Sequence, residues 1–176
     1  MTLIRADLRT AAVDALRAAG TAAGPNVFSS RAWPTDPKAL PVIQAVVLAD
    51  TAESWGRNAP GFTRTAGLLV TAKFRFDGPE DFERQSDLLC EQIELAIMGN
   101  VALQAMIQQV SAIDSDLASD ALGAVQVGVV RIRFDLEYAQ TFAPPSEPLV
   151  SIAATVRAGL DAPPINFETD FLQPEG

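Results

Sequence analysis

The chain contains no histidine among its 176 residues. Histidine is the usual general base of a catalytic triad and the commonest metal ligand, so a Ser–His–Asp triad, a Cys–His pair and a histidine metal site are excluded. The single cysteine, Cys90, rules out a zinc site built from several thiolates and a disulfide within the chain. The glycine-rich phosphate-binding patterns GxGxxG and GxxxxGK[ST] are also missing. Carboxylates remain as the only candidates for catalysis or metal binding, and no cofactor is predicted.

Long hydrophobic runs are missing too. No apolar stretch is long enough to cross a bilayer, and none follows a basic start at the amino terminus, so neither a membrane span nor a signal peptide is expected. The lone cysteine suits a reducing compartment. Cys90 falls in an apolar helical pattern, which indicates a small buried filler.

Positive charge is scarce, with 13 basic residues against 22 acidic ones and a net charge of −9. This balance argues against a nucleic-acid-binding groove, which needs clustered Lys and Arg. It is compatible with a surface that repels DNA and lets it slide past. The mean hydropathy is nevertheless slightly positive, at +0.16. Either an Ala- and Val-rich core or apolar surface buried between subunits would explain that value.

Two stretches alternate between apolar and polar residues, residues 64–77 and residues 129–138. A period of two places alternate side chains on opposite faces of a β-strand, so one face is packed and the other is wet. The sets on the packed face are Arg64, Ala66, Leu68, Val70, Ala72, Phe74 and Phe76 in the first stretch, and Val130, Ile132, Phe134, Leu136 and Tyr138 in the second.

Helical patterns lie on either side of the first alternating stretch. Residues 3–19 carry apolar side chains at spacings of three and four, and Gly20 ends the pattern. Gly78 and Pro79 open a second helix with acidic residues in its first turn. Residues 101–109 predict a shorter helix. The sequence therefore predicts an α+β fold, a small mixed, mostly antiparallel β-sheet with two main helices packed on one face. The predicted core places Phe74, Phe76, Ile132, Phe134 and Leu136 against Leu8, Phe82, Leu89 and Ile93.

The remaining segments complete the expected order. Residues 26–33 predict a short strand, residues 40–48 a central strand covered on both faces, and residues 50–63 a polar loop. Residues 110–113 predict a brief strand, residues 114–120 an acidic turn, and residues 122–141 the last long strand. Proline becomes frequent from Ala143, so we expect a main domain of residues 1–142 and a Pro-rich extension or arm of residues 143–176. Within that extension, residues 149–156 could add a strand and the last 16 residues read as an extended arm.

Charged and aromatic residues outside the core supply the candidate sites. Asp114, Asp116 and Asp120 lie close together, but their spacing lacks the Gly and the distal Glu of an EF-hand loop, which favours a solvated loop over a Ca²⁺ site. Basic residues on the two alternating strands would oppose each other if those strands were neighbours, so acidic partners would have to come from elsewhere. Either this is a solvated sheet face or it meets acidic residues of another subunit. Large aromatics beside loops, including Trp33, serve as lids over the core or as anchors of protein contacts. The predicted subunit or tube contacts are Trp55, Arg57, Phe62, Arg75, Arg131 and Arg133.

Four sequence features resemble one known family. They are the opening LRTAAVDALRAAG, the short run Phe28-Ser29-Ser30-Arg31, the Pro-led apolar run of residues 41–47, and the final Asp135-Leu136-Glu137-Tyr138. With the order of predicted elements, they resemble the tail terminator proteins of long-tailed bacteriophages, the lambda type in particular. The resemblance covers residues 3–142.

The resemblance implies a non-enzymatic virion protein at the tail–head junction, assembled in the host cytoplasm. Such a protein forms a hexameric ring that caps the tail tube, stops its polymerisation and joins it to the head–tail connector, while DNA passes through without specific binding. Asp114, Asp116 and Asp120 would then line the channel. Two alternatives stay open, another head–tail connector or neck protein, and a small cytoplasmic enzyme that uses Asp and Glu alone. The enzyme would show a concave pocket with two carboxylates of perturbed pKa, and the terminator a ring.

Overall fold

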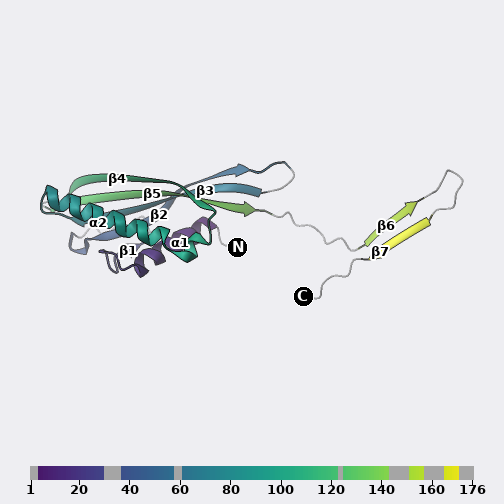
Figure 1. Cartoon of the computed structure of the whole chain (residues 1–176), viewed down its shortest axis with the longest axis horizontal. Helices are drawn as coiled ribbons and strands as arrows, with labels where there is room; N and C mark the ends of the chain where they lie inside the picture. The colour runs from purple at the N-terminus through teal and green to yellow at the C-terminus, as the bar shows by residue number, and fades with distance from the viewer. Residues whose placement is uncertain are drawn as a thin grey trace. The chain divides into compact units, whose positions relative to one another are not determined.

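The computed structural model describes residues 4–29, 37–57, 61–122, 125–142, 151–156 and 165–170. The chain divides into two compact units, Met1–Thr141 and Phe142–Gly176. The first holds a five-stranded sheet in the order β1-β2-β3-β5-β4, and the second holds a two-stranded sheet (Figure 1). No described helix is long and apolar enough to cross a membrane.

The elements of the first unit follow the predicted order. They are α1 (Ile4–Ala18), β1 (Val27–Phe28), a 3-10 turn (Pro37–Ala39), β2 (Val42–Ser54), β3 (Gly61–Arg75), α2 (Pro79–Met98), α3 (Val101–Gln104), β4 (Gln109–Leu122) and β5 (Val125–Thr141). β1 pairs with β2 in parallel, and the other three pairings are antiparallel. Since α1 and α2 both pack on this sheet, the predicted α+β fold is confirmed.

The core lies between the helices and one face of the sheet. Leu68 lies opposite Phe134 in the β3–β5 ladder and Val70 lies opposite Ile132, so both alternating sets face the same way. Leu8 of α1 and residues of α2 close over them. Phe82 contacts the sheet aromatics directly, its ring centroid lying 5.9 Å from that of Phe74. All nine residues predicted to form the core belong to this cluster or pack against it, so that prediction is confirmed.

The segment predicted as a polar loop, residues 50–63, is instead largely a hairpin. β2 continues to Ser54 and β3 begins at Gly61, with Thr51 opposite Thr65 and Glu53 opposite Thr63. Threonine fits a pleated, half-buried surface, and these cross-strand pairs extend the ladder beyond the core.

The predicted acidic turn of residues 114–120 is also wrong, because those residues lie in the middle of β4. Asp is disfavoured in strands, but here the backbone of residues 114–120 pairs with residues 127–133 of β5, and the Asp side chains point away from the core. The last long strand accordingly begins at Val125 and not at residue 122. The short helix predicted over residues 101–109 ends at Gln104.

The second unit contains β6 (Ser151–Val156) paired antiparallel with β7 (Ile165–Asp170). The strand predicted over residues 149–156 is therefore present from Ser151. The last 16 residues are not simply an extended arm, because β7 lies within them. The strand predicted over residues 26–33 is present at Val27–Phe28, and its second half, residues 30–33 with Trp33, lies outside the described residues.

Candidate interaction surface

The face of the sheet opposite the helices, called here the second face, carries most of the predicted site residues. β2, β3 and β5 enclose a shallow hollow of about 420 Å³ on this face. Gln44, at its margin, is 6% exposed and its Nε2 has no hydrogen-bond partner among the described residues. The residues lining the hollow are Gln44, Val46, Leu48, Leu69, Thr71, Lys73, Val129 and Arg131.

The basic residues of β3 and β5 are staggered rather than opposed. Arg131 lies opposite Thr71 and Arg133 lies opposite Leu69, so like charges do not face one another directly. Acidic partners come from the same chain: Arg131 Nη1 lies 2.8 Å from an oxygen of Asp116, and Arg133 Nε lies 2.8 Å from Asp135 Oδ1. These arginines are about half exposed, so each pair contributes roughly 0–1 kcal/mol.

Arg75, at the end of β3, lies 3.5 Å from Asp77 in a third, more exposed pair. The sequence analysis allowed for acidic partners from another subunit. The chain itself supplies acidic partners for these three arginines. Contact with a second subunit at Arg75, Arg131 and Arg133 stays a prediction, and it would have to compete with these existing pairs.

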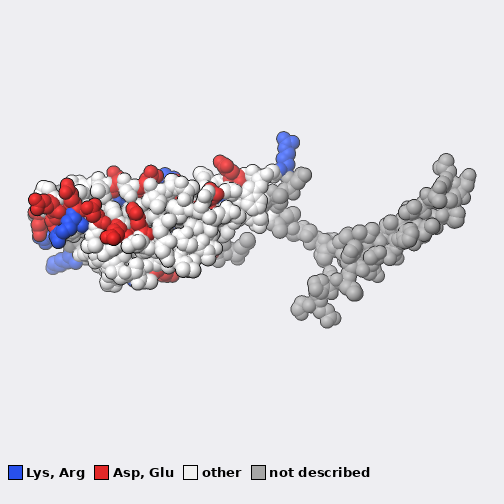
Figure 2. All heavy atoms as spheres, viewed as in Figure 1, with Lys and Arg blue, Asp and Glu red and all other residues white. Residues whose placement is uncertain are grey.

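Asp114, Asp116 and Asp120 line up on the second face of β4, where they alternate with residues that point to the helix side. Successive same-face side chains of a strand are about 7 Å apart, too far for three of them to surround one ion. The described residues contain no group of three His, Cys, Asp or Glu side chains that could hold a metal ion. The three carboxylates form an acidic stripe along the outermost strand. A separate band of Asp and Glu follows α2 (Figure 2).

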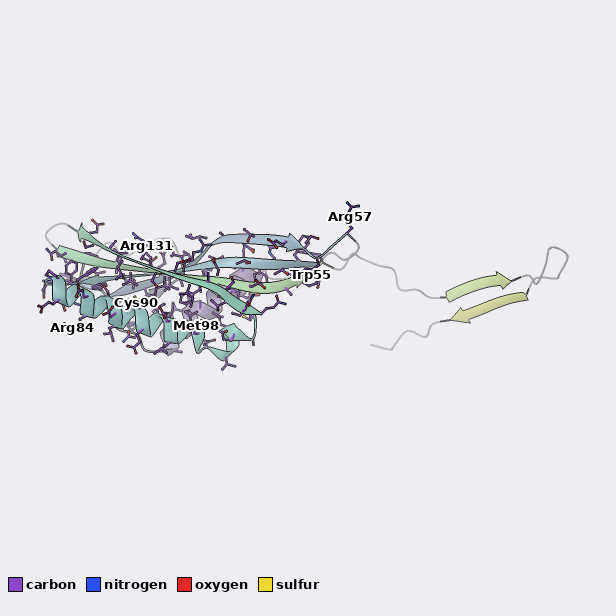
Figure 3. The ribbon with its side chains drawn as sticks, turned by 45° about the horizontal axis from the view of Figure 1, so that its top comes forward. Trp55, Arg57, Arg84, Cys90, Met98 and Arg131 are labelled. Carbon is purple, nitrogen blue, oxygen red and sulfur yellow. The ribbon has the colours of Figure 1, made fainter. Side chains whose placement is uncertain are left out.

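Trp55 and Arg57 lie at the end of the β2–β3 hairpin (Figure 3), and Phe62 lies opposite Ser54 in the same hairpin, but the three do not form one patch. Trp55 is half exposed, and its Nε1 donates a hydrogen bond of 2.7 Å to Thr63 Oγ1. Its ring covers Gly61, where an added Cβ would come within 2.2 Å of Trp55 Cε3, so a side chain at this position would displace the Trp55 ring. Phe62, between Gly61 and Thr63, points to the other face, and Arg57 extends beyond the strand into solvent.

A buried polar network at the base of this hairpin was not predicted. Arg64 grips Asp50 with two hydrogen bonds, Nε to Oδ1 at 3.1 Å and Nη2 to Oδ2 at 2.7 Å. Its Nη1 donates to Gln140 Oε1 at 2.9 Å, and the hydroxyl of Tyr138 lies 3.2 Å from Asp50 Oδ2. The hydrogen bond to Asp50 raises the pKa of Arg64 above its already high value. The network ties β2, β3 and β5 together where the apolar core ends. Its sequence signal was Arg64, the one charged residue on the apolar face of its strand.

Tyr138 makes this network measurable, because it is the only tyrosine in the chain. Burial, and then the charge of Asp50, raise the pKa of its hydroxyl. We expect the ultraviolet absorbance of tyrosinate to appear clearly above pH ~10 in the folded protein and near pH ~10 in denaturant. Because the pKa of Tyr138 is raised in the folded protein, the protonated hydroxyl contributes its full stabilisation below pH ~10. That contribution is lost as pH rises through the pKa of Tyr138 in the folded state. The protein should therefore unfold on the alkaline side. If the tyrosinate absorbance appeared at the same pH in the folded and the denatured protein, the burial of Tyr138 would be contradicted. The variant Tyr138→Phe, which has no tyrosine, gives the background absorbance.

The carboxylates at the start of α2 were the remaining candidates for chemistry. A shallow pocket there is lined by residues 77–81. Hydrogen bonds lower the pKa of Asp81, chiefly the one from Arg84 and then the one from the backbone N–H of Asp77. A lowered pKa keeps this carboxylate ionised at the positive end of the helix, which stabilises the helix start and does not suit a proton donor.

Comparison with models of known protein families and with curated proteins finds no match to this chain.

Proposed function

We propose that this protein is a structural virion protein, a ring-forming tail terminator that caps the tail tube, stops its polymerisation and presents the surface for head–tail joining. The observation that carries the proposal is the order and layering of the elements. The resemblance implies the order helix, strand, strand, long loop, strand, helix and strand. The chain has these helices and strands in that order, with a hairpin in place of the loop and one further long strand, β4, before the last. Both main helices lie on one face of the sheet. Residues 3–142, which carry the resemblance, coincide closely with the first unit.

The polar side chains of the first unit support a structural role. The strongest polar network, around Asp50 and Arg64, joins three strands and does not line either of the hollows described above. Exposed apolar side chains are plentiful for a protein with a charge of −9. Such surface is typical of a subunit that is covered on assembly. The large exposed apolar residues are Leu48, Trp55, Leu88, Leu95, Met98, Val101, Ile113, Leu117 and Phe142.

The acidic stripe of β4 fits the channel of such a ring. Asp114, Asp116 and Asp120 share the second face with Arg131 and Arg133, so a ring whose second face is turned inward would present these carboxylates together with the arginines to the passing DNA. Carboxylates repel phosphate within about a Debye length, ~8 Å at physiological salt, which lets DNA move without sticking.

The second unit favours another candidate, a different head–tail connector or neck protein. Its β6–β7 hairpin lies beyond the part of the chain that resembles tail terminators. An additional β-hairpin on a tail–head protein suits contact with a second virion component, such as the connector or the tail tube.

Adding the purified protein to polymerising tail tubes tests the two candidates. A terminator binds the growing end, so tubes measured by electron microscopy should stop at a defined length and carry a ring at one end. A neck protein would bind finished heads or tails without limiting tube growth. Tubes that lengthen as they do without the protein would refute the terminator assignment.

A further inference from the structure

Along most of both edges of the five-stranded sheet, no described strand pairs with the outermost residues. β4 forms one edge, and no described strand pairs with its outer side over 14 residues. At the other edge β1 covers only Ile43 and Gln44 of β2, so residues 45–54 have no described strand partner on that side. Each of these edges presents backbone N–H and C=O groups that are ready to pair with another strand.

β4 carries three Asp and one bulge, but otherwise lacks the features that usually protect an edge strand. It contains no proline, lysine or arginine, and its one irregularity lies near its start, between Val110 and Ala112. On its helix side, Ile113 and Leu117 are 42% and 47% exposed. A long, regular and partly apolar edge strand promotes aggregation when it is exposed, and pairing with a strand of a partner removes that risk.

The strand directions select the partner. From β2 onward the strands alternate, β2 against β3, β3 against β5, and β5 against β4. β4 and β2 therefore run in opposite directions. If a second copy continues the sheet in the same orientation, its β2 meets β4 as an antiparallel neighbour and its helices stay on the same side. Antiparallel pairing is the more stable form.

Charge argues against the symmetric alternative in which β4 pairs with β4 of a second copy. That arrangement would place the acidic stripes of Asp114, Asp116 and Asp120 beside each other, and like charges on neighbouring strands are destabilising. The free part of β2 carries one acidic residue on the second face, Glu53, together with the small Ala49 and Thr51. At the bulge of β2, Leu48 is 55% exposed.

We propose that the β4 edge of one copy pairs antiparallel with residues 45–54 of β2 in the next copy. The contact is head-to-tail, so each copy uses one edge to bind and offers the other to be bound, as a ring requires. This inference rests on the proposed ring and specifies how its subunits join. A sheet continuous from copy to copy keeps the acidic stripe on a single face of the whole assembly.

Cysteine cross-linking tests the joint in the full-length protein. With Cys90→Ser removing the native thiol, Ile113→Cys or Ser115→Cys on the helix side of β4 is mixed with Ala52→Cys or Ser54→Cys on the helix side of β2. The four combinations sample three registers two residues apart, because a shift by one would turn the side chain to the other face. Under mild oxidation, at least one combination should give a disulfide-linked dimer as its main product. When both substitutions of that combination are placed in one chain, oxidation should give a series of cross-linked oligomers that ends at the number of subunits in the ring.

Thr51→Cys is the matched control, since it lies on the same edge of β2 but points to the second face. Mixed with Ser115→Cys it should yield several-fold less dimer. Efficient self-linking of Ser115→Cys alone would show β4 against β4 and overturn the proposal. Rings seen by native mass spectrometry without cross-linking in any register would overturn the edge pairing and leave the proposed function standing. A protein that stays monomeric at every concentration would overturn both.

Discussion

Replacing Phe134 with alanine is expected to lower the free energy of unfolding by about 3–5 kcal/mol, enough to unfold a marginally stable domain. Phe134 is fully buried in the middle of β5, opposite Leu68, and belongs to the cluster under the helices. Deleting its ring removes the transfer free energy of the side chain and leaves a cavity that flanking strands cannot collapse to fill.

Urea unfolding followed by circular dichroism measures this loss. With a urea dependence of about 2 kcal/mol per molar, the midpoint should fall by roughly 1.5–2.5 M. Val101→Ala is the matched control, since Val101 is 82% exposed and its truncation should change stability by less than about 0.5 kcal/mol. Equal midpoints for Phe134→Ala and Val101→Ala would show that the β5 packing is wrong.

Replacing Arg64 with methionine is expected to lower the free energy of unfolding by about 2–3 kcal/mol. The side chain of Asp50 is 6% exposed, so removing its bidentate partner leaves a buried carboxylate that, among the described residues, keeps its hydrogen bond from the Tyr138 hydroxyl. The cost stays below the 3–5 kcal/mol seen for a fully buried pair, because the side chain of Arg64 is 21% exposed and water can partly replace it.

A double-mutant cycle separates the ion pair from the packing of the two side chains. Asp50→Leu combined with Arg64→Met removes both charges, so the double variant should be more stable than Arg64→Met alone. The matched surface pair is Arg131 with Asp116, which is about half exposed and should show a coupling energy of less than about 1 kcal/mol. If the coupling energy between Asp50 and Arg64 were no larger than that of the surface pair, the network would not stabilise the base of the β2–β3 hairpin.

Tertiary pairing overrode local propensity in β4. Residues 114–120 carry three Asp and two Ser, a composition typical of turns, yet their backbone pairs with β5 without a break from Ala112 to Leu122. The strand exists because β5, the other strand of the same hairpin, offers a ladder of backbone hydrogen bonds. The composition of residues 114–120 alone does not contain that information, since it depends on their pairing with residues 127–133.

The sequence by itself determined the parts of this protein in which one periodicity extends over many residues. The spacing of three and four in residues 3–19, the Gly78-Pro79 start of α2 and the two alternating strands determined the helices, the packed face and the core around Phe134. Burial of a continuous apolar stripe is a strong and local constraint, so its pattern can be read without knowing the partner.

Only the tertiary structure decided how the strands are ordered and which polar side chains meet. Asp50, Arg64 and Tyr138 are separated by up to 88 residues and come together because β2, β3 and β5 lie side by side. The pairing of Arg131 with Asp116, and the place of β4 at one edge of the sheet and of β1 at the other, likewise follow from strand order. Strand order depends on contacts between distant segments, and those contacts are set by the packing of the whole sheet against its helices.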